Sequence, residues 1–581
     1  MRVLLVHPED SPRFGPWSKE NWDLILDLGQ SSRDSQAAWT IQFKCSVVAL
    51  DSFRHGVKDA KIVRQIFAAG RGHIVDEEGV DWWDLTSLLI APEAMEALAL
   101  LRLAAQINRT ADLWSTRADW RTRAFEKLLS RPVRIFGHGP HARLASKTCH
   151  YASLLRRFSP AQIREILLDK YDSGFQWRAR FNSKPEQCHD AVVLLPSAYT
   201  NVSRMAAQYA QMLPEQTFLL VATRQSAKQF ARPKNVVVHD LAAYREVDRR
   251  SSEVPSLLER WASLRKDLCR FKEMDLLSGA GVFNPFEKYI RNGVAARDAW
   301  RKVIEYQPVR GILCGDDSNV YTRLPVLLGA TRNIPTADFH HGAFDGRYLL
   351  KDLPCDVYFA KNEMELDYLS RVCGLPAERI QIAPPATSIQ KVARNTETQS
   401  QSIVWFSEPF EAAGLRPEDV YRELLPPLLR LACLHRRNVI IKLHPFENPS
   451  QRRRLVREVI GPGDSKLVRI VAGPLTPDLL SQTWFGVTVE STTVVDCYRA
   501  GVCCFICGWI SLSQFGYREQ FERFGVGHIL QSANEIAGIP ERLPNFKSSS
   551  SSGLFPEADS LPLRQWLTGD VREVALGKAE P

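Results

Sequence analysis

Long apolar segments are scarce in this sequence of 581 residues. The most apolar long stretch, Leu88–Ile107, contains three charged residues, which is typical of a packed helix rather than a membrane span. The first ten residues do not read as a signal peptide, because a short apolar run is followed at once by Glu9 and Asp10. We therefore expect a cytoplasmic protein that meets a membrane only at its surface.

The 12 cysteines follow neither a zinc-binding nor a disulfide-rich pattern. No two CxxC motifs have the spacing of a zinc site, and most cysteines lie in apolar runs, as Cys45 and Cys314 do. Cys504 and Cys507 form a single CxxC, which we interpret as part of a buried strand rather than a redox motif. Free thiols in a large chain are typical of a reducing compartment.

The excess of positive charge is small for a chain of this length, with a formal net charge of +9. It permits an anionic partner but demands none. No nucleic-acid-binding motif is visible, and basic residues do not alternate with aromatic residues as they do in a stacking platform. Nucleic acid is therefore not an expected partner. The hydrophobic content of 45% excludes a largely disordered chain.

Short apolar runs alternate with longer helical patterns along the chain. The runs are Val3–Val6, Leu24–Leu26, Val133–Phe136, Ala191–Leu195, Phe218–Val221, Val236–Val238, Gly311–Cys314, Ile403–Phe406, Val439–Lys442, Leu467–Val471, Phe485–Val489 and Val502–Ile506. Runs without polar alternation predict strands buried on both faces, and strands that alternate with helices predict α/β units with parallel sheets. The strands are too many for one sheet, so at least two such units are expected.

The pattern divides the chain into three α/β units, at residues 1–185, 186–395 and 396–575. The clearest boundary is Gln390–Gln401, a polar segment without apolar periodicity that precedes a new buried run. A softer boundary lies near Phe181–His189, before another such run. In open parallel sheets ligands bind at the carboxyl ends of strands, so the residues that follow each run are the candidates for a site.

His340 and His341 follow the apolar run that ends at Ala337, and Gly342 allows a sharp turn after them. A histidine at this place can act as a general base, because its pKa lies near neutrality. The alternative is that one ring packs in the core and the other caps a loop.

Asp316 and Asp317 follow the run Gly311–Cys314. Two acids at a strand end can serve as a base, as a metal site or as acceptors for sugar hydroxyls. One of them can equally cap the helix that begins near Asn319.

Lys442 and His444 end another run, two residues apart, and Pro445 stops the strand. They share one face of an extended backbone and form a plausible phosphate clamp, in which His444 hydrogen-bonds or protonates a leaving phosphate. The alternative is the solvent-facing end of an edge strand.

Glu490 is followed by three hydroxyl residues, Ser491, Thr492 and Thr493, which open a helix that ends near Gly501. Their side chains and N–H groups could cradle a phosphate. The alternative is that Ser491 only caps the helix.

Taken together, these motifs resemble GT-B glycosyltransferases and related transferases of bacterial surface polysaccharide synthesis, the group that includes CDP-glycerol glycerophosphotransferases, Kdo transferases and bacterial sialyltransferases. In such families an HG loop of the N-domain faces the cleft, while an HP motif and a Ser/Thr-rich helix start in the C-domain hold nucleotide phosphates. The order matches His341–Gly342, His444–Pro445 and Ser491–Thr493. The resemblance implies two facing Rossmann-type domains, the second on the donor side, after an additional N-terminal α/β region of unknown role.

On the donor side, the resemblance implies that Lys442, His444 and Ser491–Thr493 hold the phosphates of a nucleotide-activated sugar. Glu408, in the loop that opens the C-domain, and Glu490 would contact the ribose or sugar of the donor. This nucleotide sugar is a substrate, and neither a separate cofactor nor a metal ion is expected.

On the acceptor side, His341, His340 or one of Asp316 and Asp317 would deprotonate the acceptor hydroxyl. The implied activity is a glycosyltransferase, or a polyol-phosphate transferase, that acts on a surface polysaccharide or glycolipid. The enzyme would be cytoplasmic and could touch the anionic inner face of the plasma membrane. The alternatives are a nucleotide-sugar epimerase or hydrolase on the same fold, which the missing Ser-Gly-Gly motif of epimerase relatives disfavours, and a non-catalytic scaffold for polysaccharide assembly.

Overall fold

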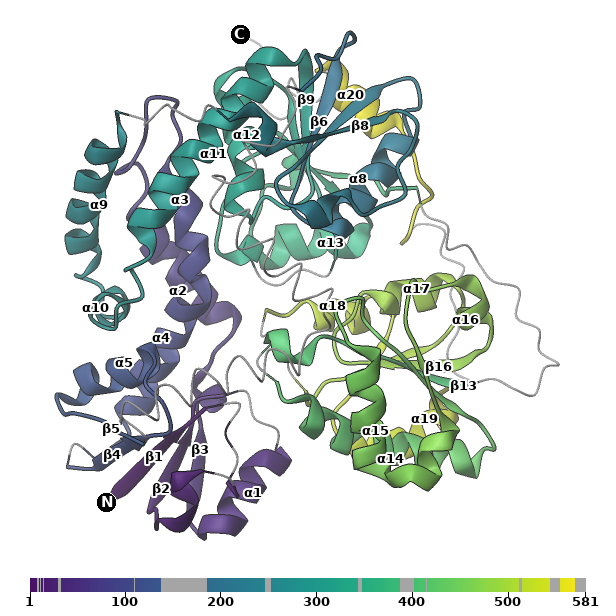
Figure 1. Ribbon diagram of the computed structural model, residues 1–581. Helices are drawn as coiled ribbons and strands as arrows, with labels where there is room; N and C mark the ends of the chain where they lie inside the picture. Colours follow the sequence, from purple (N-terminus) through teal and green to yellow (C-terminus); the bar gives the residue numbers. More distant parts are fainter. Residues whose placement is uncertain are drawn as a thin grey trace.

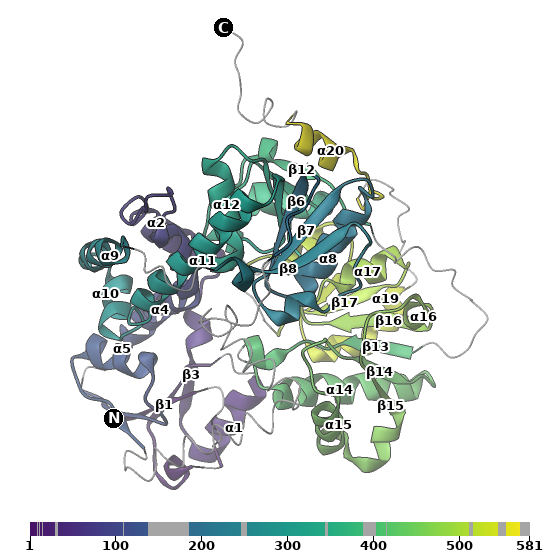
Figure 2. The same cartoon turned by 45° about the horizontal axis from the view of Figure 1, so that its top comes forward.

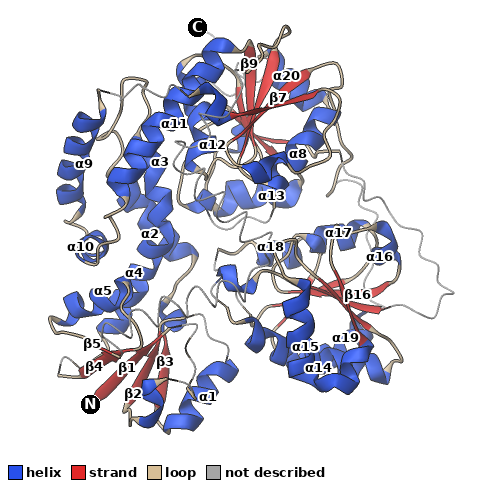
Figure 3. Ribbon diagram, viewed as in Figure 1, coloured by secondary structure: helices blue, strands red, loops and turns tan. Residues whose placement is uncertain are grey.

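Three parallel β-sheets organise the protein (Figure 1, Figure 3). The computed structural model describes residues 1–136, 185–245, 252–342, 347–386, 402–510, 515–543 and 554–569, except residues 8, 9, 11, 14, 30–32, 109 and 414. The strands in each sheet of this described part pair in parallel. The predicted α/β class with parallel sheets is therefore confirmed.

The first sheet has five strands in the order β3-β2-β1-β4-β5. Its strands are β1 (Arg2–Val6), β2 (Leu24–Asp27), β3 (Ser46–Ala49), β4 (Asp112–Ser115) and β5 (Arg134–Ile135). The helices of this unit are α1 (Arg33–Phe43), α2 (Val57–Ala68), α3 (Trp82–Thr86), α4 (Ala91–Ala104) and α5 (Trp120–Leu129). The order is that of a Rossmann-type sheet, with the first strand in the middle.

The second sheet has seven strands in the order β12-β11-β10-β9-β6-β7-β8. They are β6 (Val192–Ser197), β7 (Thr217–Ala222), β8 (Val236–Asp240), β9 (Val309–Cys314), β10 (Thr336–Asp338), β11 (Val357–Ala360) and β12 (Ile380–Ile382). The helices are α8 (Thr200–Gln211), α9 (Val254–Leu268), α10 (Lys272–Gly279), α11 (Phe286–Tyr306), α12 (Val320–Thr331) and α13 (Glu363–Asp367). Counted from β6, the order is again Rossmann-type, with the topological switch point between β6 and β9.

The third sheet has six strands in the order β15-β14-β13-β16-β17-β18. They are β13 (Ser402–Phe406), β14 (Val439–Lys442), β15 (Val468–Val471), β16 (Thr483–Thr488), β17 (Cys504–Cys507) and β18 (His528–Leu530). The helices are α14 (Pro417–Leu434), α15 (Pro449–Asp464), α16 (Pro477–Ser481), α17 (Thr493–Arg499), α18 (Arg518–Arg523) and α19 (Ile539–Arg542). All five residues of β13 are buried, because helices cover both faces of the sheet, and its switch point lies between β13 and β16.

The first two units share a helical core rather than meeting at a linker. Helix α10, which belongs to the second unit by sequence, packs against α4 and α5 of the first, and α11 contacts α3 (Figure 2). Trp83 of α3 stacks on Trp261 of α9, with ring centroids 6.0 Å apart, and Trp261 stacks on Phe286 of α11 at 4.6 Å. The first predicted boundary, near residue 185, comes directly after residues 137–184, which lie outside the described part of the chain. All of Gln390–Gln401, the second predicted boundary, also lies outside it.

Helix α20 (Leu561–Thr568) lies on the second sheet, although the sequence assigned residues 396–575 to the third unit. Leu563 and Trp566 are buried in one cluster with residues of β6 and β9. Gly311 makes this possible, because a Cβ at its position would lie 3.0 Å from Leu567 and 3.2 Å from Trp566. Helix α20 thus packs on the second unit, although the third unit comes before it in the sequence.

The second and third units face each other across the carboxyl ends of their strands, as two Rossmann-type domains should if they bind a ligand between them (Figure 1). None of the helices in the described residues is both long enough and apolar enough to cross a membrane.

Candidate functional site

A cavity of about 420 Å³ lies between the second and third units. This volume is in the range of small-molecule sites. From the second unit its polar lining consists of Arg204, Gln208, His341, Lys361, Asn362 and Glu365. From the third unit it consists of Ser407, Lys442, His444, Ser491, Thr492, Thr493, Asp496 and Arg499. Six of the eleven residues predicted for the site therefore lie on one cavity, at the carboxyl ends of two sheets.

His341 lines the cavity from the loop after β10. Its Nδ1 lies 3.3 Å from the carbonyl oxygen of Gly315, and a carbonyl can only accept, so Nδ1 carries the proton of the neutral ring. Burial lowers the pKa of His341, against the attraction of the nearby Asp316 carboxyl. The ring is therefore neutral near pH 7 and has its lone pair on Nε2, as a general base requires.

His444 lines the opposite wall, after β14, and has the other tautomer. The backbone N–H of Phe446 donates to its Nδ1 at 3.2 Å, so the proton of the neutral ring is on Nε2. Burial, together with the charge of Lys442, lowers the pKa of His444 to about 4. The backbone N–H of His444 is held by Glu447 Oε2 at 2.8 Å. His444 can thus donate a hydrogen bond to a ligand from Nε2, and its lowered pKa disfavours the protonated ring.

Lys442 is the last residue of β14 and precedes His444 by two residues. Its Nζ donates to the carbonyl oxygens of Leu443, at 2.8 Å, and Gly473, at 2.6 Å. These bonds fix the ammonium group and use two of its three protons, which leaves one to bind an anion. Burial lowers the pKa of Lys442, while Glu447 opposes that shift.

Ser491, Thr492 and Thr493 line the cavity at the switch point of the third sheet. Ser491 Oγ accepts from the backbone N–H of Thr493 at 3.3 Å, so this hydroxyl also serves the local turn. Thr493 Oγ1 is buried and has no hydrogen-bond partner within the described part of the chain. Helix α17, which begins at Thr493, spans only seven residues.

Glu408 does not line this cavity, and the prediction that it contacts the donor is not supported by its position. It is buried, and its Oε1 accepts from Thr488 Oγ1 at 2.9 Å and from the backbone N–H groups of Val489, at 3.1 Å, and Glu490, at 2.8 Å. Glu408 therefore ties β13 to the loop that carries the three hydroxyl residues. Glu490 is also buried and also lies outside the cavity lining.

Asp316 and Asp317 are buried and do not line the cavity either. Neither carboxylate caps α12, because the Asn319 side chain accepts from the Tyr321 N–H. Asp317 forms a fully buried ion pair with Lys351, whose charge holds the pKa of Asp317 below its ordinary value against the effect of burial. A sealed, paired carboxylate is poorly placed to take a proton from an acceptor, so the position of Asp317 does not support its predicted role as a base.

Asp338, at the end of β10, completes this acidic cluster. Burial and the adjacent Asp317 raise the pKa of Asp338 well above its ordinary value, so Asp338 holds a proton while Asp317 is ionised. The Tyr348 hydroxyl lies 3.2 Å from Asp317 Oδ1 and 3.4 Å from Asp338 Oδ2. The cluster is thus a polar support beneath His341 rather than a surface that meets substrate.

His340 is buried beside the cluster and outside the cavity lining. Its ring packs 4.9 Å from the ring of His341 and edge-on to Tyr348. Of the two adjacent histidines, the structure places only His341 on the cavity.

Five charged residues of the cavity were not predicted: Arg204, Lys361, Glu365, Asp496 and Arg499. Lys361 and Glu365 form an ion pair at 2.8 Å on the second unit, and Lys361 also donates to the Gly342 carbonyl at 3.1 Å. Asp496 and Arg499 lie three residues apart on α17. Burial raises the pKa of Asp496 to about 6, while Arg499 and Lys361 pull it down. The sequence could have indicated Asp496 and Arg499, because their i, i+3 spacing puts both on one face of a helix.

No group of three or more His, Cys, Asp or Glu side chains among the described residues is arranged to hold a metal ion.

No protein-family model and no curated protein matches this chain. Among solved structures, a co-structure of S. aureus MnaA with UDP is similar at 12% identity over 68% of this chain and 99% of that chain, with a TM-score of 0.42. A putative UDP-N-acetylglucosamine 2-epimerase from Listeria monocytogenes is 10% identical over 68% and 98%, with a TM-score of 0.43. CalG4, the calicheamicin glycosyltransferase, is 12% identical over 68% and 100%, with a TM-score of 0.37.

Proposed function

We propose that this protein is a glycosyltransferase, or a polyol-phosphate transferase, that uses a nucleotide-activated donor. The acceptor is a hydroxyl group of a surface polysaccharide or glycolipid. The reaction takes place in the cavity between the second and third units. The third unit binds the donor phosphates, and the second unit supplies the base.

One observation carries this proposal: the two walls of the cavity present histidines in opposite tautomers. His341 offers a lone pair on Nε2, and His444 offers an Nε2–H, because backbone groups fix the Nδ1 atoms of the two rings in opposite roles. A transfer to a hydroxyl group needs such a pair, with an acceptor for the proton of the nucleophile and a donor for the departing oxygen.

The charges of the cavity suit a phosphate-bearing ligand. Lys361 is paired with Glu365, and Arg499 lies near Asp496, whereas Lys442 donates to two carbonyl oxygens, which carry no full charge. With both histidines neutral, the cations lining the cavity outnumber its anions. The buried Thr493 hydroxyl adds a donor that a phosphate oxygen would satisfy.

In the proposed step, His341 Nε2 takes the proton of the acceptor hydroxyl as the acceptor oxygen bonds to the anomeric carbon of the donor. The bond between that carbon and the phosphate oxygen breaks, and the oxygen leaves with the electron pair. Lys442 and the Nε2–H of His444 stabilise the charge that develops on it. For a polyol-phosphate donor, the same base would activate attack at phosphorus, and the nucleoside phosphate would leave.

Calorimetry with CDP-, CMP-, UDP- and GDP-activated sugars tests the donor site. We expect one of them to bind to the wild type and to bind at least tenfold more weakly to His444→Ala, which loses a charge-assisted hydrogen bond of about 1.5–3 kcal/mol. His341→Ala should bind the same donor as the wild type does but transfer nothing. If no donor binds to the wild type, the proposed function is wrong.

The same donor separates transfer from epimerisation or hydrolysis. A transferase should leave the donor intact until an acceptor is added, and product formation should then depend on His341. Rapid conversion of the donor in the absence of an acceptor would instead identify an epimerase or hydrolase.

A further inference from the structure

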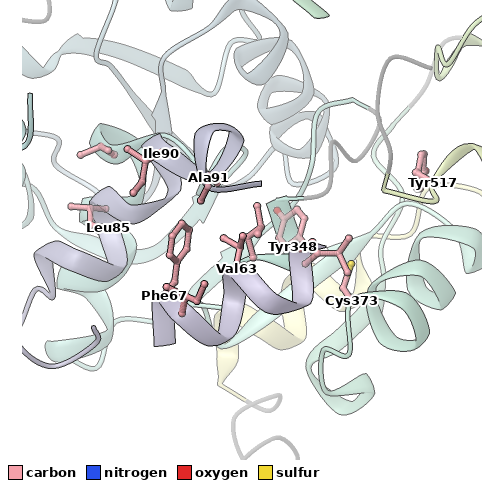
Figure 4. Close-up of a cluster of buried hydrophobic side chains, with 14 of the residues drawn as sticks. Val63, Phe67, Leu85, Ile90, Ala91, Tyr348, Cys373 and Tyr517 are labelled. Atoms are coloured by element: carbon pink, nitrogen blue, oxygen red, sulfur yellow. The ribbon is translucent and has the colours of Figure 1, made fainter. Parts of the chain in front are cut away.

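The N-terminal unit reaches the candidate site through helix α2. Ala60, Val63, Ile66 and Phe67 form the buried face of this helix, which contacts the 3-10 turn Arg347–Leu349 of the second unit. Figure 4 shows Val63 beside Tyr348, with Cys373 next to them. Helix α2 of the first unit therefore packs against the turn Arg347–Leu349 of the second unit.

Two arginines of the first unit form ion pairs with Asp352, which follows residues 347–351 in the sequence. Arg64 and Arg71 both bind the carboxylate of Asp352. Arg64 also donates to the Cys373 carbonyl at 3.0 Å. Arg71 is itself held by Asp84, whose second carboxylate oxygen binds Arg323 of α12 at 2.6 Å. The residues next to Asp352 are thus fixed from the side of the N-terminal unit.

The segment held in this way supports the acidic cluster behind His341. Lys351 pairs with Asp317 and donates to Ser318 Oγ at 3.0 Å. Arg347 lies 3.6 Å from Asp316 Oδ1. Residues 347–351 therefore bind the loop Gly315–Ser318, which follows β9, through Lys351 and Arg347.

That loop in turn fixes the tautomer of His341, because the carbonyl of Gly315 accepts from Nδ1. The charged groups that face His341 are Asp316 from this loop, Arg347 from the held segment and Lys361 from the loop after β11. Two of these three depend on residues 347–351: Arg347 belongs to them, and Asp316 lies 3.6 Å from Arg347.

We propose that the N-terminal unit positions the base: Arg64 and Arg71, by clamping Asp352, hold residues 347–351 against the acidic loop and so keep His341 oriented toward the cavity. This inference rests on the proposed function for the role of His341 as a base. It gives the N-terminal unit a task that the two facing units could not perform alone. Arg64, Arg71 and Asp352 are positioning residues, since none of them lines the cavity.

The kinetic test compares Arg64→Ala/Arg71→Ala with Arg332→Ala. Arg332 is a matched control: its side chain is 27% exposed, as are those of Arg64 and Arg71, and it also joins the first two units, but through Glu78. With the donor identified by calorimetry, we expect kcat of the double variant to fall about tenfold, as for a misplaced catalytic group, while its donor KM stays unchanged. Arg332→Ala should match the wild type, and Arg64→Lys/Arg71→Lys should recover part of the loss because it keeps the charge.

A second readout does not depend on activity. Diethyl pyrocarbonate modifies the neutral imidazole, so peptide mass spectrometry across a pH series gives the rate and the midpoint for each histidine. In Arg64→Ala/Arg71→Ala and in Asp352→Asn, the His341 rate should rise and its midpoint should move toward the ordinary histidine range, because the ring becomes less buried. His444, on the other wall, serves as the internal control and should keep its profile.

The two readouts separate the inference from the proposed function. If the His341 profile and kcat of the double variant equal those of Arg332→Ala, the N-terminal unit does not position His341 and the inference fails. If the wild type transfers sugar from no donor, the proposed function fails, and the His341 modification profile alone then decides whether the clamp orients the ring.

Discussion

Glu408 illustrates how burial and hydrogen bonding compete at a single carboxyl group. Its Oε1 accepts three hydrogen bonds from the last residue of β16 and the loop after it, and these bonds favour the ionised form. Burial opposes them and is the larger effect, so the pKa of Glu408 is raised to about 7. The residue that ties β13 to the loop of the three hydroxyl residues thus changes its charge near neutral pH.

This shift predicts a pH-dependent stability. The folded protein binds the Glu408 proton more tightly than the unfolded chain does, so its contribution is fully present below the ordinary glutamate pKa and is lost as the pH rises through about 7. Glu408→Gln keeps an acceptor and has no proton to lose. We therefore expect the unfolding free energy of Glu408→Gln, minus that of the wild type, to rise by up to about 3 kcal/mol from pH 4.5 to pH 8.

Thermal unfolding of the wild type and Glu408→Gln at several pH values measures this difference as a change in Tm. Glu458→Gln, an exposed position on α15 of the same unit, is the control and should show no comparable trend. A Tm difference that stays constant with pH would mean that Glu408 does not titrate in this range.

At the scale of elements, every apolar run that the sequence singled out as a strand overlaps a strand of the structure. Of the strands it missed, β3 and β18 are short and only partly buried, while β11 is fully buried and apolar but has only four residues. The rule that ligands bind at the carboxyl ends of strands also predicted His341, Lys442 and His444, which line the cavity. The sequence could not show that Asp317 is sealed, because its partner Lys351 is 34 residues away and meets it only in the folded chain.

Helix α20 gives a test of tertiary packing at this scale. Trp566 is 2% exposed and packs on the second sheet beside Gly311. We expect Trp566→Ala to lower the unfolding free energy by about 3–5 kcal/mol, because it removes a large buried ring and leaves a cavity. Urea unfolding followed by circular dichroism measures the loss.

Leu561→Ala on the same helix is the matched control. Leu561 is 54% exposed, so its truncation should cost no more than about 0.5 kcal/mol. Equal effects of the two substitutions would show that α20 does not pack on the second sheet through Trp566.

At the scale of the molecule, ion pairs as well as apolar contacts join the N-terminal unit to the second unit. Arg297 of α11 is almost fully buried and binds Asp76 of the first unit at 2.6 Å. It also binds Glu253 and Asp298 of its own unit. Asp76 further accepts from Trp82 Nε1 at 2.9 Å, so the pair lies within the shared aromatic core. A rigid junction of this kind is what the proposed positioning of His341 requires.

The junction predicts a large effect of Arg297→Met. Removing the guanidinium leaves Asp76 buried without its cation, so we expect a loss of about 3–5 kcal/mol in thermal or urea unfolding. The double variant Arg297→Met/Asp76→Asn should recover part of this loss, because the uncompensated charge is then gone. Arg301→Met, one helical turn further along α11, removes a partly exposed pair with Glu78 and should cost about 1 kcal/mol or less. If Arg297→Met is no more harmful than Arg301→Met, the buried Arg297–Asp76 pair does not stabilise the junction between the two units.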